Sequence, residues 1–190
     1  TRIAGCDLGQ TTLGWAVVSE GPDGSRALVD SGALPHDGRP LEAFQRWYEA
    51  HGIAGCRSLG ATGLHAGDLA APVTSWPEDG CLEAALALAG LPETVNLVSI
   101  GGRGYRVLVR QPALHPTATG HRGPAWDVRY LENEKCASGT GENLRKIAAR
   151  FGLTLAEADA LALAATASIP ITARCSVFTK SEMTHHANEG

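Results

Sequence analysis

The sequence is poor in several kinds of residue. Its 190 residues include only three lysines, one methionine and 5% aromatic side chains. No segment approaches the roughly 18 consecutive apolar residues that a membrane-spanning helix requires. The net charge of −4 also excludes the basic surplus typical of proteins that bind nucleic acid or an anionic membrane. These absences favour a globular protein that works neither on nucleic acid nor in a membrane.

Cysteines are few and odd in number, and no signal-peptide pattern precedes the first strand-like segment. Both features argue against a disulfide framework and predict a cytoplasmic protein with reduced thiols. Cys6, Cys56 and Cys81 stand in no recognisable motif and are expected in the core. The sequence also contains no Ser-His-Asp arrangement and no P-loop pattern. His185 and His186 are adjacent and lack a third metal ligand at suitable spacing, so they are interpreted as surface residues.

Hydrophobic periodicity predicts alternating strands and helices, and 44% hydrophobic residues suffice for a sizeable core. Residues 111–126 are expected to form a long loop. One helix is expected to start soon after Cys175. The other expected helices lie at 41–51, 79–89, 140–150 and 155–167. The expected strands lie at 3–6, 13–19, 27–34, 58–62, 95–100, 105–109 and 127–131.

Two glycine-containing turns stand in similar strand contexts half a chain apart. The first is DLGQTT at 7–12, and the second is SIGG at 99–102. Glycine lets the backbone approach a phosphate, N–H groups and hydroxyls act as donors, and a carboxylate such as Asp7 can hold hydrated Mg²⁺. Either turn alone is more often an ordinary hairpin. Their recurrence favours a pair of phosphate loops.

The segments around two cysteines are the most specific part of the sequence. Residues 135–141 are KCASGTG and residues 174–182 are RCSVFTKSE. Each cysteine is expected just before a helix, where unsatisfied N–H groups and the helix dipole favour a thiolate. The alternative is that Cys136 and Cys175 are buried structural thiols.

Together these motifs resemble the activators of 2-hydroxyacyl-CoA dehydratases and the ATPase subunits of benzoyl-CoA reductases. The resemblance runs from residue 3 to 190, and its weaker matches are ATG at 61–63 and Glu83. It implies an α/β, actin-like ATPase (ribonuclease H-like) fold of the actin, Hsp70 and sugar-kinase superfamily. Two related lobes, 1–94 and 95–190, would enclose the nucleotide cleft. The later part of the family fold is expected to be absent.

The resemblance also implies cofactors, partners and site residues. Asp7 would be the catalytic residue and a Mg²⁺ ligand through water. Cys136 and Cys175 from each of two subunits would share one [4Fe–4S] cluster in a homodimer, because such a cluster usually takes four thiolates. Ferredoxin or flavodoxin would donate an electron, and a dehydratase or reductase would receive it. The implied ATP/ADP-binding residues are Gly9, Gln10, Thr11, Thr12, Gly101, Gly102 and Arg103.

The second loop departs from the family pattern Asp-Ile-Gly-Gly-Gln-Asp. Ser99 replaces the first aspartate, and Arg103 and Gly104 replace the final pair. The glycine donors remain, but groups that orient metal or water are lost, which places ATP hydrolysis in question. A degenerate nucleotide- and cluster-binding module with a structural or regulatory role is therefore the alternative function. A carbohydrate kinase of the same superfamily would leave both cysteine motifs unexplained.

Overall fold

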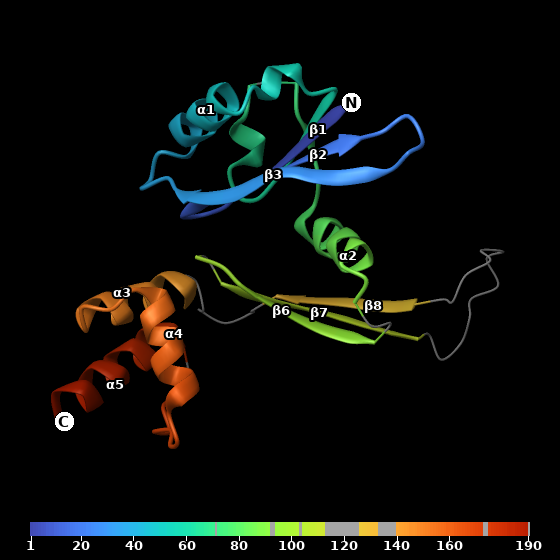
Figure 1. Ribbon diagram of the computed structural model, residues 1–190. Helices are drawn as coiled ribbons and strands as arrows, with labels where there is room; N and C mark the ends of the chain where they lie inside the picture. The colour runs from blue at the N-terminus through green and yellow to red at the C-terminus, as the bar shows by residue number, and fades with distance from the viewer. Residues whose placement is uncertain are drawn as a thin grey trace. The chain divides into compact units, whose positions relative to one another are not determined.

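A computed structural model of the protein describes residues 1–70, 72–91, 94–102, 104–112, 126–132, 140–172 and 175–189. The chain divides into two compact units, Thr1–Leu91 and Pro92–Gly190. Figure 1 labels most of their helices and strands. Within the described ranges, no helix is long and apolar enough to cross a membrane.

A five-stranded sheet, ordered β3-β2-β1-β4-β5, forms the N-terminal unit. Its first three strands make an antiparallel meander, whereas the last two add in parallel. The strands are β1 (Arg2–Leu8), β2 (Thr12–Glu20), β3 (Arg26–Pro35), β4 (Ser58–Thr62) and β5 (Thr74–Ser75). The four longer strands confirm the periodicity, and β5 was not predicted because two residues are too few to show an alternation.

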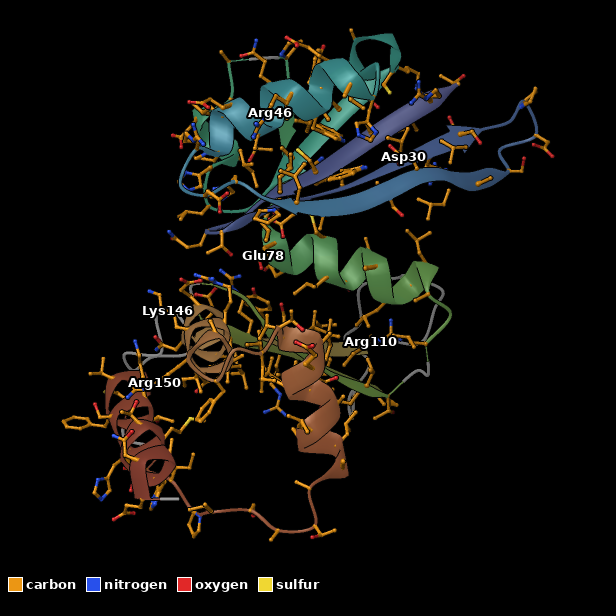
Figure 2. The ribbon with its side chains drawn as sticks, turned by 60° about the vertical axis from the view of Figure 1, so that its left-hand side comes forward. Asp30, Arg46, Glu78, Arg110, Lys146 and Arg150 are labelled. Carbon is orange, nitrogen blue, oxygen red and sulfur yellow. The ribbon has the colours of Figure 1, made fainter. Side chains whose placement is uncertain are left out.

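Helix α1 (Pro40–Ala50) packs on one face of this sheet, and the two together form the hydrophobic core. Its Phe44 and Trp47 pack in one cluster with the buried residues of β1, and Trp47 is 1% exposed. Leu41, which is apolar and lies on the same helix, is nevertheless 48% exposed. At 100° per residue it lies roughly 110° from the centre of the buried stripe. Arg46, labelled in Figure 2, is also on the exposed side.

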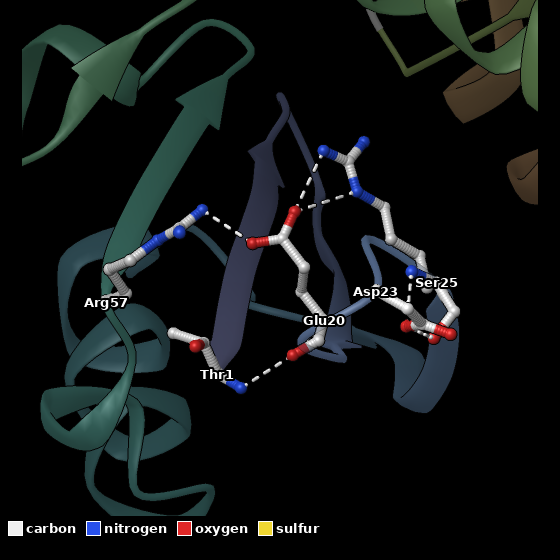
Figure 3. Close-up of polar contacts among 6 residues, drawn as sticks. Thr1, Glu20, Asp23, Ser25 and Arg57 are labelled. Atoms are coloured by element: carbon white, nitrogen blue, oxygen red, sulfur yellow. Dashed lines mark hydrogen bonds and ion pairs between the residues drawn. The ribbon is translucent and has the colours of Figure 1, made fainter.

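Charged residues tie the strands together at the sheet end farthest from the β1–β2 turn. The Glu20 carboxylate accepts hydrogen bonds from Arg26 at 3.1 and 3.2 Å and pairs with Arg57 at 2.9 Å (Figure 3). The terminal amine of Thr1 donates to the Glu20 carbonyl at 2.8 Å. The Arg26 hydrogen bond, with the Arg57 charge, lowers the pKa of Glu20.

Beyond β4, the N-terminal unit continues through two short segments into α2 (Glu78–Leu88). This helix starts within one residue of the predicted position. Its first turn carries Glu78 and Asp79. Acidic side chains at this position stabilise the helix, because they lie at the positive end of its dipole.

The C-terminal unit consists of a three-stranded antiparallel meander followed by three helices. Helix α3 packs against both of the others. The elements are β6 (Val95–Ile100), β7 (Tyr105–Pro112), β8 (Trp126–Glu132), α3 (Thr140–Arg150), α4 (Leu155–Ala164) and α5 (Ser176–Glu189). All six were predicted, but α4 ends three residues early because Ala165 is extended, with ψ of 133°.

Most of the loop predicted at 111–126 lies outside the described residues, and its ends differ from the prediction. Gln111 and Pro112 extend β7, and Trp126 opens β8. The two edge positions are paired across the hairpin, Pro112 with Trp126. Proline is compatible with a strand end, where no further ladder hydrogen bond is required from it.

Candidate functional site

The first phosphate-loop candidate is the tight turn between β1 and β2. The Gly9 N–H donates to the Thr12 carbonyl at 3.0 Å. Directly beneath, Leu8 pairs with Leu13, and both side chains are 0% exposed. The turn therefore stands on a fully buried apolar pair, which holds its backbone in one place.

Asp7 lies in the middle of a row that crosses three strands. Its neighbours are Gly14 of β2 and Thr62 of β4. The Asp7 side chain is exposed, while the Thr62 hydroxyl is buried with no hydrogen-bond partner among the described residues. A carboxylate beside a hydroxyl and a glycine backbone is a suitable environment for a hydrated cation.

Gly63 explains the ATG segment that the sequence matched only weakly. Its φ is +94°, and a Cβ at this position would collide with the Asp7 carboxylate and lie 2.7 Å from the Leu8 carbonyl oxygen. The His65 N–H donates to that same carbonyl at 3.0 Å. The segment after β4 therefore packs directly against Asp7, and only glycine permits this approach.

His36 supports the first loop from the turn between β3 and α1. The residue is 2% exposed, and its Nε2 lies 3.1 Å from the Gly9 carbonyl oxygen. Its backbone N–H donates to the Thr11 carbonyl at 3.1 Å. Because a carbonyl can only accept, Nε2 carries the ring proton. No motif around His36 signals this position, so the role of this histidine is not visible in the sequence.

A cavity of about 330 Å³ adjoins Asp7 on the N-terminal sheet. Trp15, Trp76 and Cys81 contribute to its lining. Cys6 also reaches it but is 6% exposed, and burial, together with the neighbouring Asp7 charge, raises the pKa of its thiol to about 12. Cys6 therefore stays protonated at neutral pH, in line with a core residue.

The other two thiols expected in the core are less buried than predicted. Cys56 packs partly buried against the hydrophobic cluster of the N-terminal unit. Cys81 is also partly exposed, because it lies in α2 beside the cavity rather than under α1. Neither position is as enclosed as that of Cys6.

The second phosphate-loop candidate repeats the hydrogen bonding of the first. Here the Gly101 N–H donates to the Gly104 carbonyl at 2.8 Å, as Gly9 does to Thr12. Ile100 pairs with Tyr105 beneath the turn. Gly102 lies within the turn, and Arg103 lies outside the described residues. The internal repeat suggested by the sequence therefore extends to the backbone.

Superposing the two hydrogen-bond patterns assigns equivalent positions to the residues beneath each turn. Ser99 takes the position of Asp7, and Arg106, its cross-strand neighbour, takes that of Gly14. The Arg106 guanidinium donates to Glu132 at 2.8 Å. The Asp7 carboxylate of the first loop thus corresponds to the Ser99 hydroxyl of the second. The residue opposite Ser99 is Arg106, which carries a guanidinium.

Helix α3 begins directly against the second loop. The Gly141 N–H donates to the Gly101 carbonyl at 3.0 Å, and a Cβ on Gly141 would lie 2.6 Å from that oxygen. The last glycine of KCASGTG is therefore required by this close approach. Cys136 and the rest of that motif up to residue 139 lie outside the described residues.

Cys175 lies immediately before α5 as a partly buried, free thiol. Its carbonyl accepts hydrogen bonds from the N–H and the hydroxyl of Thr179, both at 3.0 Å. The same hydroxyl lies 2.8 Å from the Thr172 carbonyl oxygen, so its single proton is shared between the two carbonyls. Glu182 accepts the Thr172 N–H at 2.6 Å. Two motif side chains thus hold the segment that leads into Cys175.

Metal-ligating side chains are sparse in the part of the chain that the structure describes. It contains no group of three or more His, Cys, Asp and Glu residues able to hold a metal. A cluster shared between two chains would need only two thiolates from each. One of the two predicted here, Cys136, is not among the described residues, so this prediction stays a prediction.

Similarity in sequence connects the chain to one protein of known activity. The 2-hydroxyisocaproyl-CoA dehydratase activator of Clostridioides difficile is 28% identical over 99 residues. The match covers 52% of this chain and 33% of that protein. No family model matches the sequence.

Two solved structures match the whole chain in fold. One is the activator of the 2-hydroxyisocaproyl-CoA dehydratase from Clostridium difficile with bound ADPNP, with a TM-score of 0.73 and 22% identity. The other is (R)-2-hydroxyglutaryl-CoA dehydratase component A from Acidaminococcus fermentans, with a TM-score of 0.71 and 21% identity. The chain therefore shares the fold of these two activators and resembles one activator in sequence over half of its own length. This shared fold confirms the actin-like architecture predicted from the motifs.

The chain matches only part of the proteins it resembles. It spans 66% and 69% of the two solved activators. The fold is therefore shared over the whole of this chain but over about two thirds of those proteins.

Proposed function

We propose that this chain binds Mg²⁺–ATP or ADP and helps to deliver a low-potential electron to a 2-hydroxyacyl-CoA dehydratase or a benzoyl-CoA reductase-type enzyme. The observation that carries the proposal is the repeated turn, with the same glycine N–H hydrogen bond in each unit. The solved relative with bound ADPNP supports the choice of ligand.

Asp7 would hold the magnesium ion through water, beside the Thr62 hydroxyl. Its exposed carboxylate lies near the end of a strand whose Ala4, Cys6 and Leu8 are buried in the core. Backbone N–H groups and hydroxyls of both turns would contact the phosphates. The proposed contacts are Gly9, Gln10, Thr11, Thr12, Gly101, Gly102 and Arg103.

Cys136 and Cys175 of two chains would hold one [4Fe–4S] cluster in a homodimer. Cys175 fits a ligand position, because its thiol is partly exposed at the start of the 14-residue helix α5, where the helix dipole favours a thiolate. When bound, such a cluster supplies one-electron chemistry. Thr179 and Glu182 would keep the thiol oriented.

The proposed partners are a ferredoxin or flavodoxin donor and the dehydratase or reductase acceptor. The name of the curated relative supports the dehydratase. A cytoplasmic location belongs to the same proposal, because free thiols persist in a reducing compartment.

A degenerate module that binds nucleotide and cluster with little ATPase activity is the second candidate. Ser99 and Arg106 favour it, because they put a hydroxyl and a guanidinium where the first loop has Asp7 and Gly14. Mg²⁺-dependent turnover would separate the two functions, since both include nucleotide binding.

Calorimetry with Mg–ADPNP tests the nucleotide proposal. Asp7→Ala should weaken binding about tenfold or more, because the metal loses its carboxylate; tenfold corresponds to about 1.4 kcal/mol. Asp159→Ala, an exposed position on α4, is the matched control and should bind like the wild type. Equal affinity in the Asp7 variant would remove the first loop from the site.

Anaerobic iron analysis tests the cluster proposal. A shared [4Fe–4S] cluster corresponds to about two irons per chain. Cys136→Ser or Cys175→Ser should abolish its absorption and weaken dimerisation together, since the metal forms the bridge. Cys6→Ala and Cys81→Ala should leave both intact. Four irons per chain, or a cluster that survives either serine substitution, would contradict the shared site.

A further inference from the structure

In both turns, the carbonyl of the first glycine accepts a hydrogen bond from a group outside the turn. The donor differs between the two turns. In the first turn, the Gly9 carbonyl accepts from the His36 ring at 3.1 Å. In the second, the equivalent Gly101 carbonyl accepts from the Gly141 N–H at the start of α3, at 3.0 Å. The two donors differ in type and in chain position, yet they reach the same atom of the repeat.

Peptide geometry determines what this anchoring does to the rest of each turn. Every described peptide bond is trans, so the C=O and the following N–H of one peptide plane point in opposite directions. With the Gly9 carbonyl directed at His36, the Gln10 N–H is turned to the opposite side. His36 also holds the Thr11 carbonyl through its backbone N–H, which turns the Thr12 N–H in the same way.

The surroundings of the His36 ring indicate that the hydrogen bond to the Gly9 carbonyl is what this side chain contributes. The side chain is 2% exposed, and its Nδ1 has no hydrogen-bond partner among the described residues. An unpartnered buried nitrogen costs stability that a hydrocarbon side chain would not cost. What the imidazole supplies and a hydrocarbon cannot is the Nε2–H donor to Gly9.

We propose that His36 is a positioning residue of the first phosphate loop, and that Gly141 has the same task in the second. Each holds the carbonyl of the leading glycine and so presents the next N–H group to the ligand side. This inference rests on the proposed nucleotide function for its consequence, but not for its geometry, because the carbonyl contacts exist without ligand.

His36→Gln and His36→Asn form the decisive pair of variants. A glutamine amide reaches the position of Nε2, whereas an asparagine amide reaches only that of Nδ1. In the nucleotide-free chain, the Gly9 amide, which donates to the Thr12 carbonyl within the turn, should exchange with solvent about three- to tenfold faster in the asparagine variant. The glutamine variant should restore most of the wild-type rate.

Mg–ADPNP affinity should change in parallel, about three- to tenfold weaker for asparagine and near wild type for glutamine. His51→Asn is the matched control, because His51 is half-buried and pairs with Asp30, away from the turn. It should leave the exchange of the Gly9 amide unchanged. Equal exchange in the His36 asparagine and glutamine variants would overturn the positioning role.

Gly141→Ala tests the second turn. The added Cβ would lie 2.6 Å from the Gly101 oxygen, so the contact must open. Exchange of the Gly101 amide, which donates to the Gly104 carbonyl, should then rise by a similar factor. Gly55→Ala is the control, because a Cβ there meets nothing within 4 Å. Unchanged Gly101 exchange would overturn the inference for this turn.

The two proposals fail in distinguishable ways. A wild-type chain that binds no nucleotide would refute the proposed function, while the exchange rates would still decide whether His36 and Gly141 orient their turns. Faster exchange in His36→Asn with unchanged affinity in a binding-competent chain would refute the consequence for the ligand.

Discussion

The N-terminal and C-terminal units contain the same turn, but the residues beneath it are packed very differently. In the N-terminal unit the turn rests on Leu8 and Leu13, both 0% exposed. In the C-terminal unit it rests on Ile100, 56% exposed, and Tyr105, 41% exposed. The hairpin hydrogen bonds are nearly equal in length, so local backbone geometry forms the turn and the core decides how firmly it is held.

Core size differs in the same direction. Helix α1 and the first sheet enclose one continuous buried cluster, whereas Leu108 and Ala148 are the buried apolar residues among the described positions of the C-terminal unit. Helix α4 buries none of its residues, and Leu163 on it is 81% exposed. The second loop therefore depends more on the α3 contact through Gly141 than on packing beneath it.

Matched leucine truncations should give the largest difference between the units. We expect Leu13→Ala to lower the free energy of unfolding by about 3–5 kcal/mol, because the fully enclosed site cannot collapse. Leu108→Ala, 1% exposed at the start, should cost about 2 kcal/mol, since its thinner surroundings can relax into the space.

Urea unfolding followed by tryptophan fluorescence reports mainly the N-terminal unit, which contains three of the four tryptophans. Amide exchange in β7 reports the C-terminal unit. Both measurements are needed, because two units do not guarantee a single transition. A loss at Leu108 equal to or larger than that at Leu13 would break the comparison of the two cores.

Restoring a carboxylate to the second loop should come next in size. Ser99→Asp, with or without Arg103→Gln and Gly104→Asp, should raise nucleotide turnover about a hundredfold, or about 2.7 kcal/mol of barrier, because a group that positions metal or water returns. Ser31→Asp on the exposed face of β3 controls for added charge. A wild-type rate that matches the Ser99 variant would show that the two loops do not differ in this way.

Weakening the hydrogen bond that holds the segment before Cys175 should give a smaller effect, within the C-terminal unit. Glu182→Gln weakens the bond to the Thr172 N–H, and local opening should become about tenfold more frequent. Labelling of the Cys175 thiol in the metal-free chain should speed up accordingly. Glu189→Gln, at the far end of α5, should leave the rate unchanged. Equal labelling of wild type and Glu182→Gln would remove this carboxylate from the support of the cysteine.

Glu142 should give the smallest effect, and one that depends on pH. Hydrogen bonds from Arg145, assisted by Lys146, lower the pKa of this carboxyl to about 2. Because the folded value lies below the unfolded one of about 4.3, the stabilisation is present above that value and is lost as pH falls towards 2.

At neutral pH, Glu142→Gln should cost about 0.5–1 kcal/mol in the C-terminal unit, from its place in the first helical turn and its i,i+3 and i,i+4 pairs. Thermal melts between pH 7 and pH 3 should show the difference from wild type narrowing. Glu83→Gln, exposed on α2, should show no such trend. A constant difference across this range would contradict the ion-pair origin.

The elements of the fold were largely predictable because each carries its own local signal. The strands of both meanders are rich in apolar and β-branched residues. Thr154 with Glu157 forms a capping box that starts α4. The substitution at Ser99 was also visible, since the surrounding glycines identify the loop. Local sequence could not reveal that Arg106 stands opposite Ser99, because that pairing depends on the register of two strands.

By itself, the sequence determined the order and type of the secondary structure, the two glycine turns and the two cysteine motifs, because these depend on neighbours in the chain. Only the tertiary structure decided which distant residues support each turn. His36 reaches Gly9 across 27 positions, Gly63 packs on Asp7 through the parallel β1–β4 pair, and Gly141 meets Gly101 at the start of α3. Such contacts leave no periodic pattern, since a glycine or a histidine carries no mark of the partner that folding brings to it.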